Sequence, residues 1–289
     1  MIKSKSQKAG DWAIALFCVA LMLICVLPLI TVLARSLSSA TALIKGKVWL
    51  WPVEFNLNAY ATVLGDSRYP RSLLWTAFLT LCGTSLSLLM TALCAFPLIY
   101  PQLKGRSFFN GAILFTMYFS AGTIPSFLLI KSLNLLNNPL VLVLPGCLSV
   151  FNMLIMRNFF YGIPDSMRES AELDGAGPIR TLINIYLPMS MPVIATLALF
   201  YAVGRWNGYS DALMYINSEH RELYPIQMLL YQMLNSSQGV DAAQQESIPG
   251  VAETIKSAAV MFATIPILCI YPWLQRYFIA GVTLGAEKG

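Results

Sequence analysis

Four carboxylates lie between Pro164 and Pro188, in the second half of this 289-residue chain, and three of them, Glu169, Glu172 and Asp174, are clustered. On a helix, Glu169 and Glu172 would be neighbours at i,i+3, and Asp174 follows them. Paired carboxylates of this kind can act as a general acid and a general base. The sequence shows no substrate pocket beside them, however, and it favours a solvated polar face over a catalytic pair.

A second polar group interrupts an apolar run further along, at Arg205, Trp206 and Asn207, with Asp211 at i+4 from Asn207. A charge within a membrane span normally faces the bundle interior or a water-filled cavity. An aromatic face, an amide and a cation together suit a sugar, and an acidic sugar in particular. These four residues are the candidate substrate pathway. Two alternatives stay open: Arg205 reaches the outer interface, or it pairs with Asp211 for structure.

Other kinds of site lack the residues they need. There is no G-x-x-x-x-G-K-[ST] phosphate loop, so this chain should not hydrolyse ATP itself. His220 is the only histidine. The six cysteines are scattered through apolar runs without a C-x-x-C pair, and they are interpreted as small buried hydrophobic residues. We therefore expect no metal site and no cofactor bound by this chain.

The composition is that of an integral membrane protein. The chain is 57% hydrophobic and 11% charged, with a mean hydropathy of +0.64, whereas a soluble domain carries about a quarter charged residues. The net charge of +5 is therefore not a nucleic-acid signal, and no nucleic acid is expected as a partner. Basic residues are instead sorted by the side of the membrane on which they lie.

Six apolar runs predict an all-α membrane protein with six transmembrane helices, since about 20 residues suffice to span a bilayer. The predicted spans are 12–34, 72–103, 107–130, 140–160, 189–213 and 257–278. We expect a bend or break at Gly122 and Pro125, and bends at Pro266 and Pro272. The first run is too long for a signal peptide. Six spans place both termini in the cytoplasm, together with the polar stretch from Pro164 to Pro188.

That polar stretch predicts a short, closed helix. Ser166 and Glu169 have the S-x-x-E spacing of a capping box. Gly175 is a natural left-handed helix stop, and Pro178 prevents the same helix from resuming. A helix of roughly two turns is marginal alone in water, so its own protein or a partner must hold it. The alternative is an ordinary connector at the membrane interface.

The spacing of this stretch resembles the EAA loop of binding-protein-dependent ABC importer permeases, whose form is EAA-x3-G-x9-I-x-LP. The matching residues here are Glu169, Ser170, Ala171, Gly175, Ile185, Leu187 and Pro188. The one departure is Ser170, which replaces one small residue by another. The spacing match is highly specific.

Further segments look like the carbohydrate branch of that family, and within it like permeases for oligosaccharides of acidic polysaccharides such as alginate. They are Asn158-Phe159-Phe160 with Ile163-Pro164, Trp206-Asn207, and the run from Tyr271 to Phe278. The resemblance covers nearly the whole chain. It implies a first transmembrane helix and outer loop at 1–71, a type-1 permease domain at 72–279 with a coupling loop at 164–188, and a cytoplasmic tail at 280–289.

The resemblance also implies a type I importer fold and a set of partners in the bacterial inner membrane. The short helix would be a coupling helix that docks on a cytoplasmic ATPase, where Glu169 and Asp174 would meet basic groups. The partners would be a second homologous permease, two ABC ATPase subunits that bind ATP and Mg, an extracytoplasmic solute-binding protein, membrane lipid and an oligosaccharide substrate. An ion-coupled secondary transporter is the main competitor, but its coupling favours acidic residues within the spans, which are nearly absent here. A membrane enzyme is the other competitor, and it lacks a nucleophile or metal set.

Overall fold

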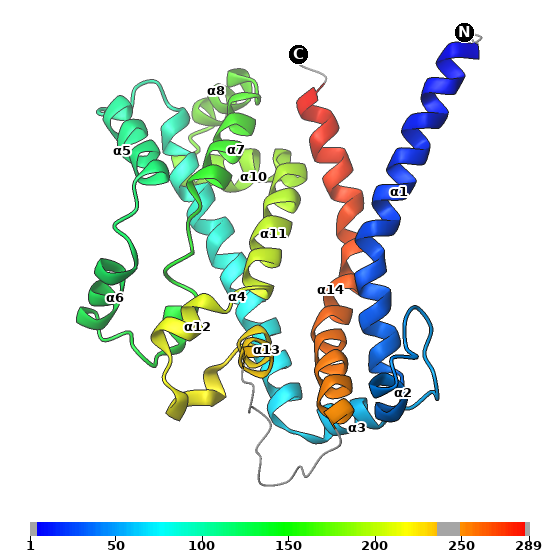
Figure 1. The fold of residues 1–289 in the computed structure, drawn as a ribbon. Coiled ribbons are helices and arrows are strands. Elements are labelled where there is room, and N and C mark those ends of the chain that lie inside the picture. Colours follow the sequence, from blue (N-terminus) through cyan, green and yellow to red (C-terminus); the bar gives the residue numbers. More distant parts are fainter. Residues whose placement is uncertain (1–4, 236–248, 287–289) are drawn as a thin grey trace. The chain divides into compact units, whose positions relative to one another are not determined.

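The computed structural model describes residues 5–235 and 249–286, with side chains over 10–235 and 250–270, and every regular element in those ranges is helical. The element order is shown in Figure 1. The elements are α1 (Lys5–Ser36), α2 (Ala40–Ile44), α3 (Asn58–Gly65), α4 (Arg68–Ala95), η1 (Pro97–Ile99), α5 (Arg106–Tyr118), α6 (Thr123–Ser132), η2 (Pro139–Leu142), α7 (Val150–Tyr161), α8 (Asp165–Leu173), α9 (Pro178–Thr181), η3 (Leu182–Tyr186), α10 (Leu187–Met189), α11 (Met191–Trp206), α12 (Ser210–Tyr215), η4 (Ser218–Leu223), α13 (Ile226–Asn235) and α14 (Pro249–Ala286).

Three stretches of the described chain are helical, long and apolar enough to cross a membrane: Gly10–Ser36, Arg68–Ile99 and Gly250–Ile270. Two bent pairs, Arg106–Tyr118 with Thr123–Ser132 and Pro178–Met189 with Met191–Trp206, bring the total to five if each pair counts as one span. The all-α prediction is confirmed. The number of six spans stays a prediction.

The expected break in the third span is confirmed: α5 ends at Tyr118, Phe119 is extended, and Gly122 directly precedes the next helix. This residue is the N-cap of α6 and has φ of +88°, a backbone conformation that favours glycine. The helices on either side of the break, α5 and α6, differ in direction by 115°.

Three predicted spans differ from the helices observed. The run at 140–160 is not one helix, because it begins as the 3-10 turn η2 and becomes α-helical only at Val150. The fifth run ends at Trp206 rather than at 213, and α12 begins a separate helix. The sixth continues as one helix through both prolines and starts at Pro249. Hydropathy marks the residues that suit lipid, whereas backbone hydrogen bonds decide where a helix begins and ends.

The chain forms two compact units, one of residues 1–70 with 230–265 and one of residues 71–229 with 266–289. In the first unit, α1 is exposed along its apolar length, as expected for a helix that faces lipid. Beyond its end, Ser38 donates a hydrogen bond to the Ala34 carbonyl and accepts one from the backbone N–H of Val53. These bonds hold the loop after α1 against the last turn of that helix.

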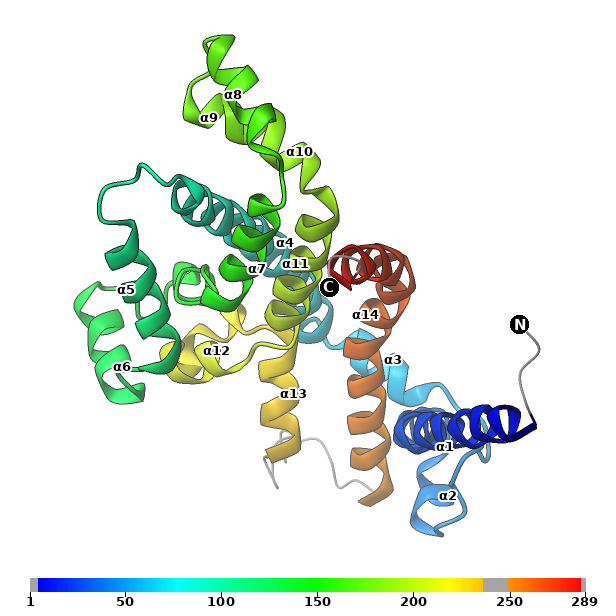
Figure 2. The same cartoon turned by 90° about the horizontal axis from the view of Figure 1, so that it is seen from above.

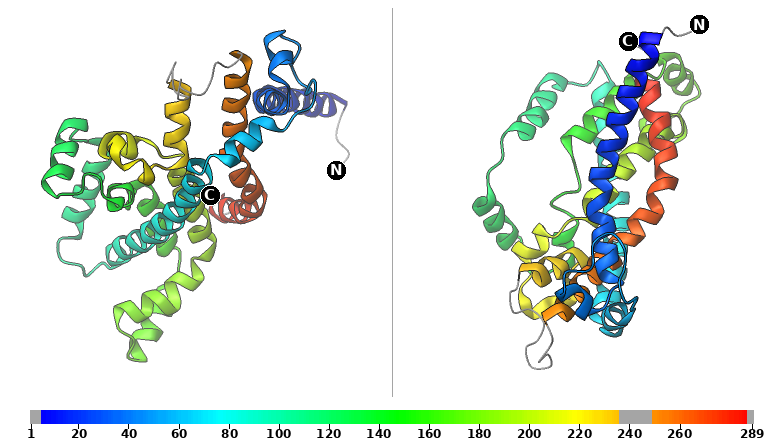
Figure 3. Two further views of the ribbon diagram at one scale, coloured as in Figure 1. Left: turned by 90° about the horizontal axis from the view of Figure 1, so that it is seen from below. Right: turned by 45° about the vertical axis from the view of Figure 1, so that its right-hand side comes forward.

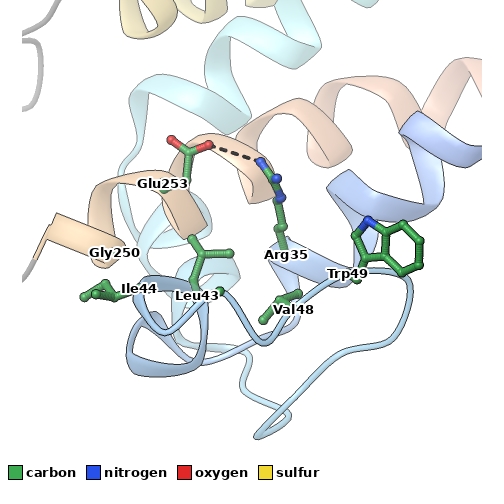
Figure 4. A pocket seen from close by; sticks show the side chains of 8 residues that line it. Arg35, Leu43, Ile44, Val48, Trp49, Gly250 and Glu253 are labelled. Carbon is green, nitrogen blue, oxygen red and sulfur yellow. Dashed lines mark ion pairs between the residues drawn. The ribbon is translucent and has the colours of Figure 1, made fainter.

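A cavity of about 520 Å³ lies in this first unit, between the end of α1, α2 and the first turns of α14 (Figure 4). Arg35 and Glu253 point toward one another across it, with 3.7 Å between Nη1 and Oε1. The backbone of α14 comes very close to α2 here, because a Cβ added at Gly250 would overlap the Ala40 carbonyl oxygen.

We expect Gly250→Ala to destabilise this unit by about 1–3 kcal/mol, the usual cost of overpacking, because a backbone atom cannot move aside as a flexible side chain would. The matched control is Gly111→Ala on α5, where an added Cβ meets no atom within 4 Å. Thermal unfolding of both purified variants in detergent checks the prediction. Equal melting temperatures for the two variants would contradict it.

The second unit has its apolar core where the end of α4 meets α7, η3 and α11, a group of helices that Figure 2 shows together. Phe96, Phe160 and Tyr186 are buried there. Deeper along α11, Tyr201 Oη lies 2.7 Å from Thr91 Oγ1 and accepts a hydrogen bond from the backbone N–H of Ser149. Helix α11 therefore tethers both α4 and the start of α7.

Candidate functional site

The polar stretch forms helix α8, followed by a tight reversal into α9. It projects from α7 and α11 in Figure 2 and in the left view of Figure 3. Gly175 has φ of +77°, so the predicted left-handed stop is confirmed. The Gly175 N–H bonds to the Glu172 carbonyl and the Ala176 N–H bonds to the Ala171 carbonyl. These two bonds satisfy carbonyls that the helix end would leave unpaired.

The predicted capping box at Ser166 is wrong. Helix α8 begins two residues earlier than that box requires, at Asp165, with Pro164 as N-cap and no side-chain capping bond. The first turn is closed by a bond from the Met167 N–H to the Pro164 carbonyl. Because Ser166 is already inside the helix, its hydroxyl cannot cap it, and Asp165 supplies the negative charge that favours a helix N-terminus.

Arg168 forms ion pairs with three carboxylates of α8. Arg168 Nη1 donates to Glu172 Oε1 at 2.9 Å, and Arg168 Nη2 lies 3.7 Å from Asp165 and 3.8 Å from Glu169. The hydrogen bond to Glu172 raises the pKa of Arg168, which keeps the guanidinium charged. The arginine faces inward while its acidic neighbours and Asp174 face solvent, so the outer face of α8 is acidic.

Two large apolar side chains near Gly175 in the sequence are largely exposed to solvent. Leu173 is 90% exposed at the last turn of α8 and Ile179 is 70% exposed on α9. Neither residue was among the predicted site residues. Their exposure could have been predicted from the sequence. Both are isolated apolar residues in a polar segment, which has no apolar core of its own to bury them. They are the most exposed large apolar side chains of the stretch from Pro164 to Pro188.

The second half of the motif has a different role from the first. Ile185 and Leu187 are partly buried and pack against the core of the unit. They lie at the junction of the π-helix η3 and α10, and π-helical turns often occur at functional sites. Pro188 lies just before the break at Ser190, where the chain turns by 85° into α11. The motif therefore joins an exposed helix to a bend in a membrane helix.

Arg205 sits at the end of α11 and bonds to irregular backbone. Its Nη1 donates to the Leu142 carbonyl at 2.9 Å and its Nη2 to the Val143 carbonyl at 2.7 Å. Both acceptors lie where η2 ends, in the predicted fourth span. Non-helical backbone at membrane depth needs partners from the protein itself, and this side chain supplies two.

Two glycines make room for this guanidinium. A Cβ at Gly83 would lie 3.1 Å from Arg205 Nε, and a Cβ at Gly146 would lie 3.1 Å from Nη2. Any side chain at either position would press on the arginine. Neither glycine was a predicted site residue, because nothing along the chain indicates that both flank one side chain.

Arg205 and Asp211 together line a cavity of about 170 Å³, with Thr76 and Ser210 among its other walls. The other two residues of the predicted pathway are placed differently. Trp206 is 7% exposed, and the Asn207 amide donates to the carbonyl of Val203 within its own helix turn. The structure therefore brings two of the four predicted pathway residues to one cavity.

The chain matches the family model of the binding-protein-dependent transport system inner membrane component over residues 83–284. The chain belongs to this family. The match includes α8, Gly175, the bend at Pro188 and the Arg205 region.

Two relatives of this chain align with it over nearly their whole length. The polygalacturonan/rhamnogalacturonan transport system permease protein YtcP of Bacillus subtilis is 40% identical, over 96% of this chain and 98% of the relative. Protein LplC of the same organism is 37% identical, over 100% of this chain and 98% of the relative. A chain of a bacterial ABC transporter involved in the import of the acidic polysaccharide alginate superimposes with a TM-score of 0.86 and 33% identity, covering 96% of this chain and 99% of that one.

The prediction that the six cysteines are buried is wrong for three of them. All six are free thiols, and Cys18, Cys25 and Cys269 are exposed. They lie on α1 and α14, and an apolar side chain on a membrane helix is as well placed against lipid as in a core. In the described part of the chain, no group of three or more His, Cys, Asp or Glu residues could hold a metal ion.

Proposed function

We propose that this chain is the membrane permease subunit of an ATP-driven importer of oligosaccharides, and that separate ATPase subunits supply the energy at α8. The observation that carries the proposal is the exposed pair Leu173 and Ile179 beside the acidic face of α8. Both lie in a segment that matches the family motif and lacks a core of its own. A partner with an apolar groove rimmed by basic residues would cover them.

We infer that α8 transmits a displacement of the ATPase subunits to α11. Helix α8 is closed at its C-terminus by two backbone bonds at Gly175, and its sequence continues through α9 into the π-helix and the 85° bend. Glu169, Ser170 and Asp174 are exposed for contact with the ATPase. Nucleotide-driven closure of the ATPases would move α8, and the bend at Pro188 would transfer that movement to α11.

The substrate class is proposed as oligosaccharides of acidic polysaccharides. The names of the relatives, which concern polygalacturonan, rhamnogalacturonan and alginate, support this. In this chain the proposed pathway passes through the cavity that Arg205 and Asp211 line together with the hydroxyl residues Thr76 and Ser210. Trp206 and Asn207 would hold the adjoining turn in place.

The proposed assembly contains this chain, a second homologous permease, two cytoplasmic ATPase subunits and an extracytoplasmic binding protein. ATP and Mg would bind to the ATPase subunits and no cofactor to this chain. Both termini and α8 would lie in the cytoplasm, with six spans in all. A solved alginate transporter that holds a pentasaccharide-bound periplasmic protein has a chain of similar fold, with a TM-score of 0.58 and 14% identity.

The test is purification of the tagged chain from its host, followed by reconstitution in liposomes. We expect an ATPase subunit to co-purify, and we expect uptake of oligogalacturonides or alginate oligosaccharides that stops with orthovanadate and continues with a protonophore. Neutral arabino-oligosaccharides serve as the comparison substrate. Uptake that a protonophore abolishes and vanadate spares would instead support the ion-coupled alternative.

A further inference from the structure

Arg168 is the charged side chain of α8 that turns away from solvent. Its side chain is 13% exposed, whereas that of Asp165 is 81% exposed. Its guanidinium carbon lies 5.4 Å from the centre of the Tyr100 ring, within the distance at which a cation is attracted to an aromatic face. Tyr100 directly follows η1, so this contact joins α8 to the segment that follows α4.

Tyr100 is the outermost member of an aromatic cluster. Its ring packs edge-on against Phe96 with centroids 5.2 Å apart. Phe96 in turn contacts Tyr186 at 5.1 Å, and Tyr186 contacts Phe160 at 5.4 Å. These residues come from the end of α4, the end of α7 and the π-helix η3. Arg168 therefore touches the place where three membrane segments meet.

Little else in the described structure orients α8. None of its nine residues is fully buried, and only Arg168 and Ala171 are half-buried, so apolar packing holds the helix only weakly. Its backbone enters through Pro164 and leaves through the turn at Gly175. The ion pairs from Arg168 to Asp165, Glu169 and Glu172 stay within α8, so they fix the guanidinium without attaching the helix to anything.

We propose that Arg168 and Tyr100 form a joint that passes the displacement of α8 to the aromatic cluster of Phe96, Tyr100, Phe160 and Tyr186. The joint sets how much sugar is moved for each ATP hydrolysed. This inference rests on the proposed function of α8. Both residues are positioning residues, because their contact lies inside the permease and touches neither nucleotide nor sugar.

The test compares three single variants and one double variant in the purified, reconstituted complex. Arg168→Gln removes the cation, Tyr100→Leu removes the aromatic face, and Tyr100→Phe keeps the face as the matched control. The probe is a mixture of oligogalacturonides and alginate oligosaccharides, and the readout is sugar imported per ATP hydrolysed. We expect the ratio of sugar imported to ATP hydrolysed to fall roughly threefold to tenfold in Arg168→Gln and in Tyr100→Leu, from the usual strength of a cation–aromatic contact. The double variant should show the same fall, because both changes remove one contact. The ratio should stay normal in Tyr100→Phe.

A second readout needs no sugar. Backbone amide exchange over 182–187 is measured in the complex with and without ATP and orthovanadate. The wild type and Tyr100→Phe should change their protection on trapping, and Arg168→Gln and Tyr100→Leu should lose that change while the ATPase still co-purifies.

The outcomes separate the two proposals. If no ATPase co-purifies with the wild type, the proposed function fails and the joint fails with it. If the wild type assembles and responds to ATP but Tyr100→Leu keeps both the normal ratio and the normal exchange response, the joint alone is overturned. Loss of ATPase binding in Arg168→Gln and Tyr100→Leu would also overturn it, because the contact would then shape the docking surface rather than pass on movement.

Discussion

Gly175→Val is expected to abolish productive coupling, with loss of ATPase co-purification and a drop in sugar uptake of roughly tenfold or more. The cause is the backbone and not a shortage of space. Gly175 has φ of +77°, and an added Cβ would meet no atom within 4 Å. A left-handed conformation costs an ordinary residue about 1–2 kcal/mol, and a β-branched residue is the least suited to it. The reversal after α8 would therefore open.

Two control variants isolate that cause. Gly175→Asn places a side chain of similar length where Asn tolerates positive φ, and it should retain most uptake. Gly177→Val adds the same bulk two residues on, where φ is −72° and no atom lies within 4 Å of an added Cβ, and it should also retain uptake. If Gly175→Val matched these two controls in ATPase binding and uptake, the turn would not be needed for coupling.

Arg205→Ala is expected to lower the stability of the protein before it changes any preference for substrate. The change removes two hydrogen bonds from a charged donor to the Leu142 and Val143 carbonyls. Bonds to charged groups contribute about 1.5–3 kcal/mol each in water-soluble proteins, and bonds between membrane helices contribute about 0.6–1.7 kcal/mol. We expect a total loss of roughly 1–3 kcal/mol, measured by thermal unfolding in detergent.

Arg205→Lys distinguishes a structural from a substrate-binding role. Lysine keeps the charge but lacks the planar fork that reaches both carbonyls at once. If the fork matters, Lys should destabilise nearly as much as Ala, and uptake of acidic and neutral oligosaccharides should fall together with the amount of folded transporter. The comparison variant is Lys131→Ala, which removes an exposed cation at the end of α6. Normal stability with selective loss of acidic oligosaccharide uptake would place Arg205 in contact with the sugar instead.

Much of this protein follows from sequence because some properties are local. Uniform apolar runs mark the segments that suit lipid, whatever their neighbours. Gly175 stops a helix because of its own backbone freedom, so both the stop and the short helix before it were predicted and observed. The motif spacing from Glu169 to Pro188 placed the chain in its family, and the family match over residues 83–284 confirms that placement.

The tertiary structure decided what depends on distant partners. In the fourth apolar run the carbonyls of Leu142 and Val143 lie outside any α-helix, and Arg205, far along the chain, supplies their hydrogen bonds. Whether Arg168 faced solvent or the protein depended on Tyr100, and hydropathy carries no information about either contact. Sequence by itself determined that a polar, closed helix stands outside the membrane helices. Only the folded chain decided that its arginine faces inward while Leu173 and Ile179 are left open for a partner.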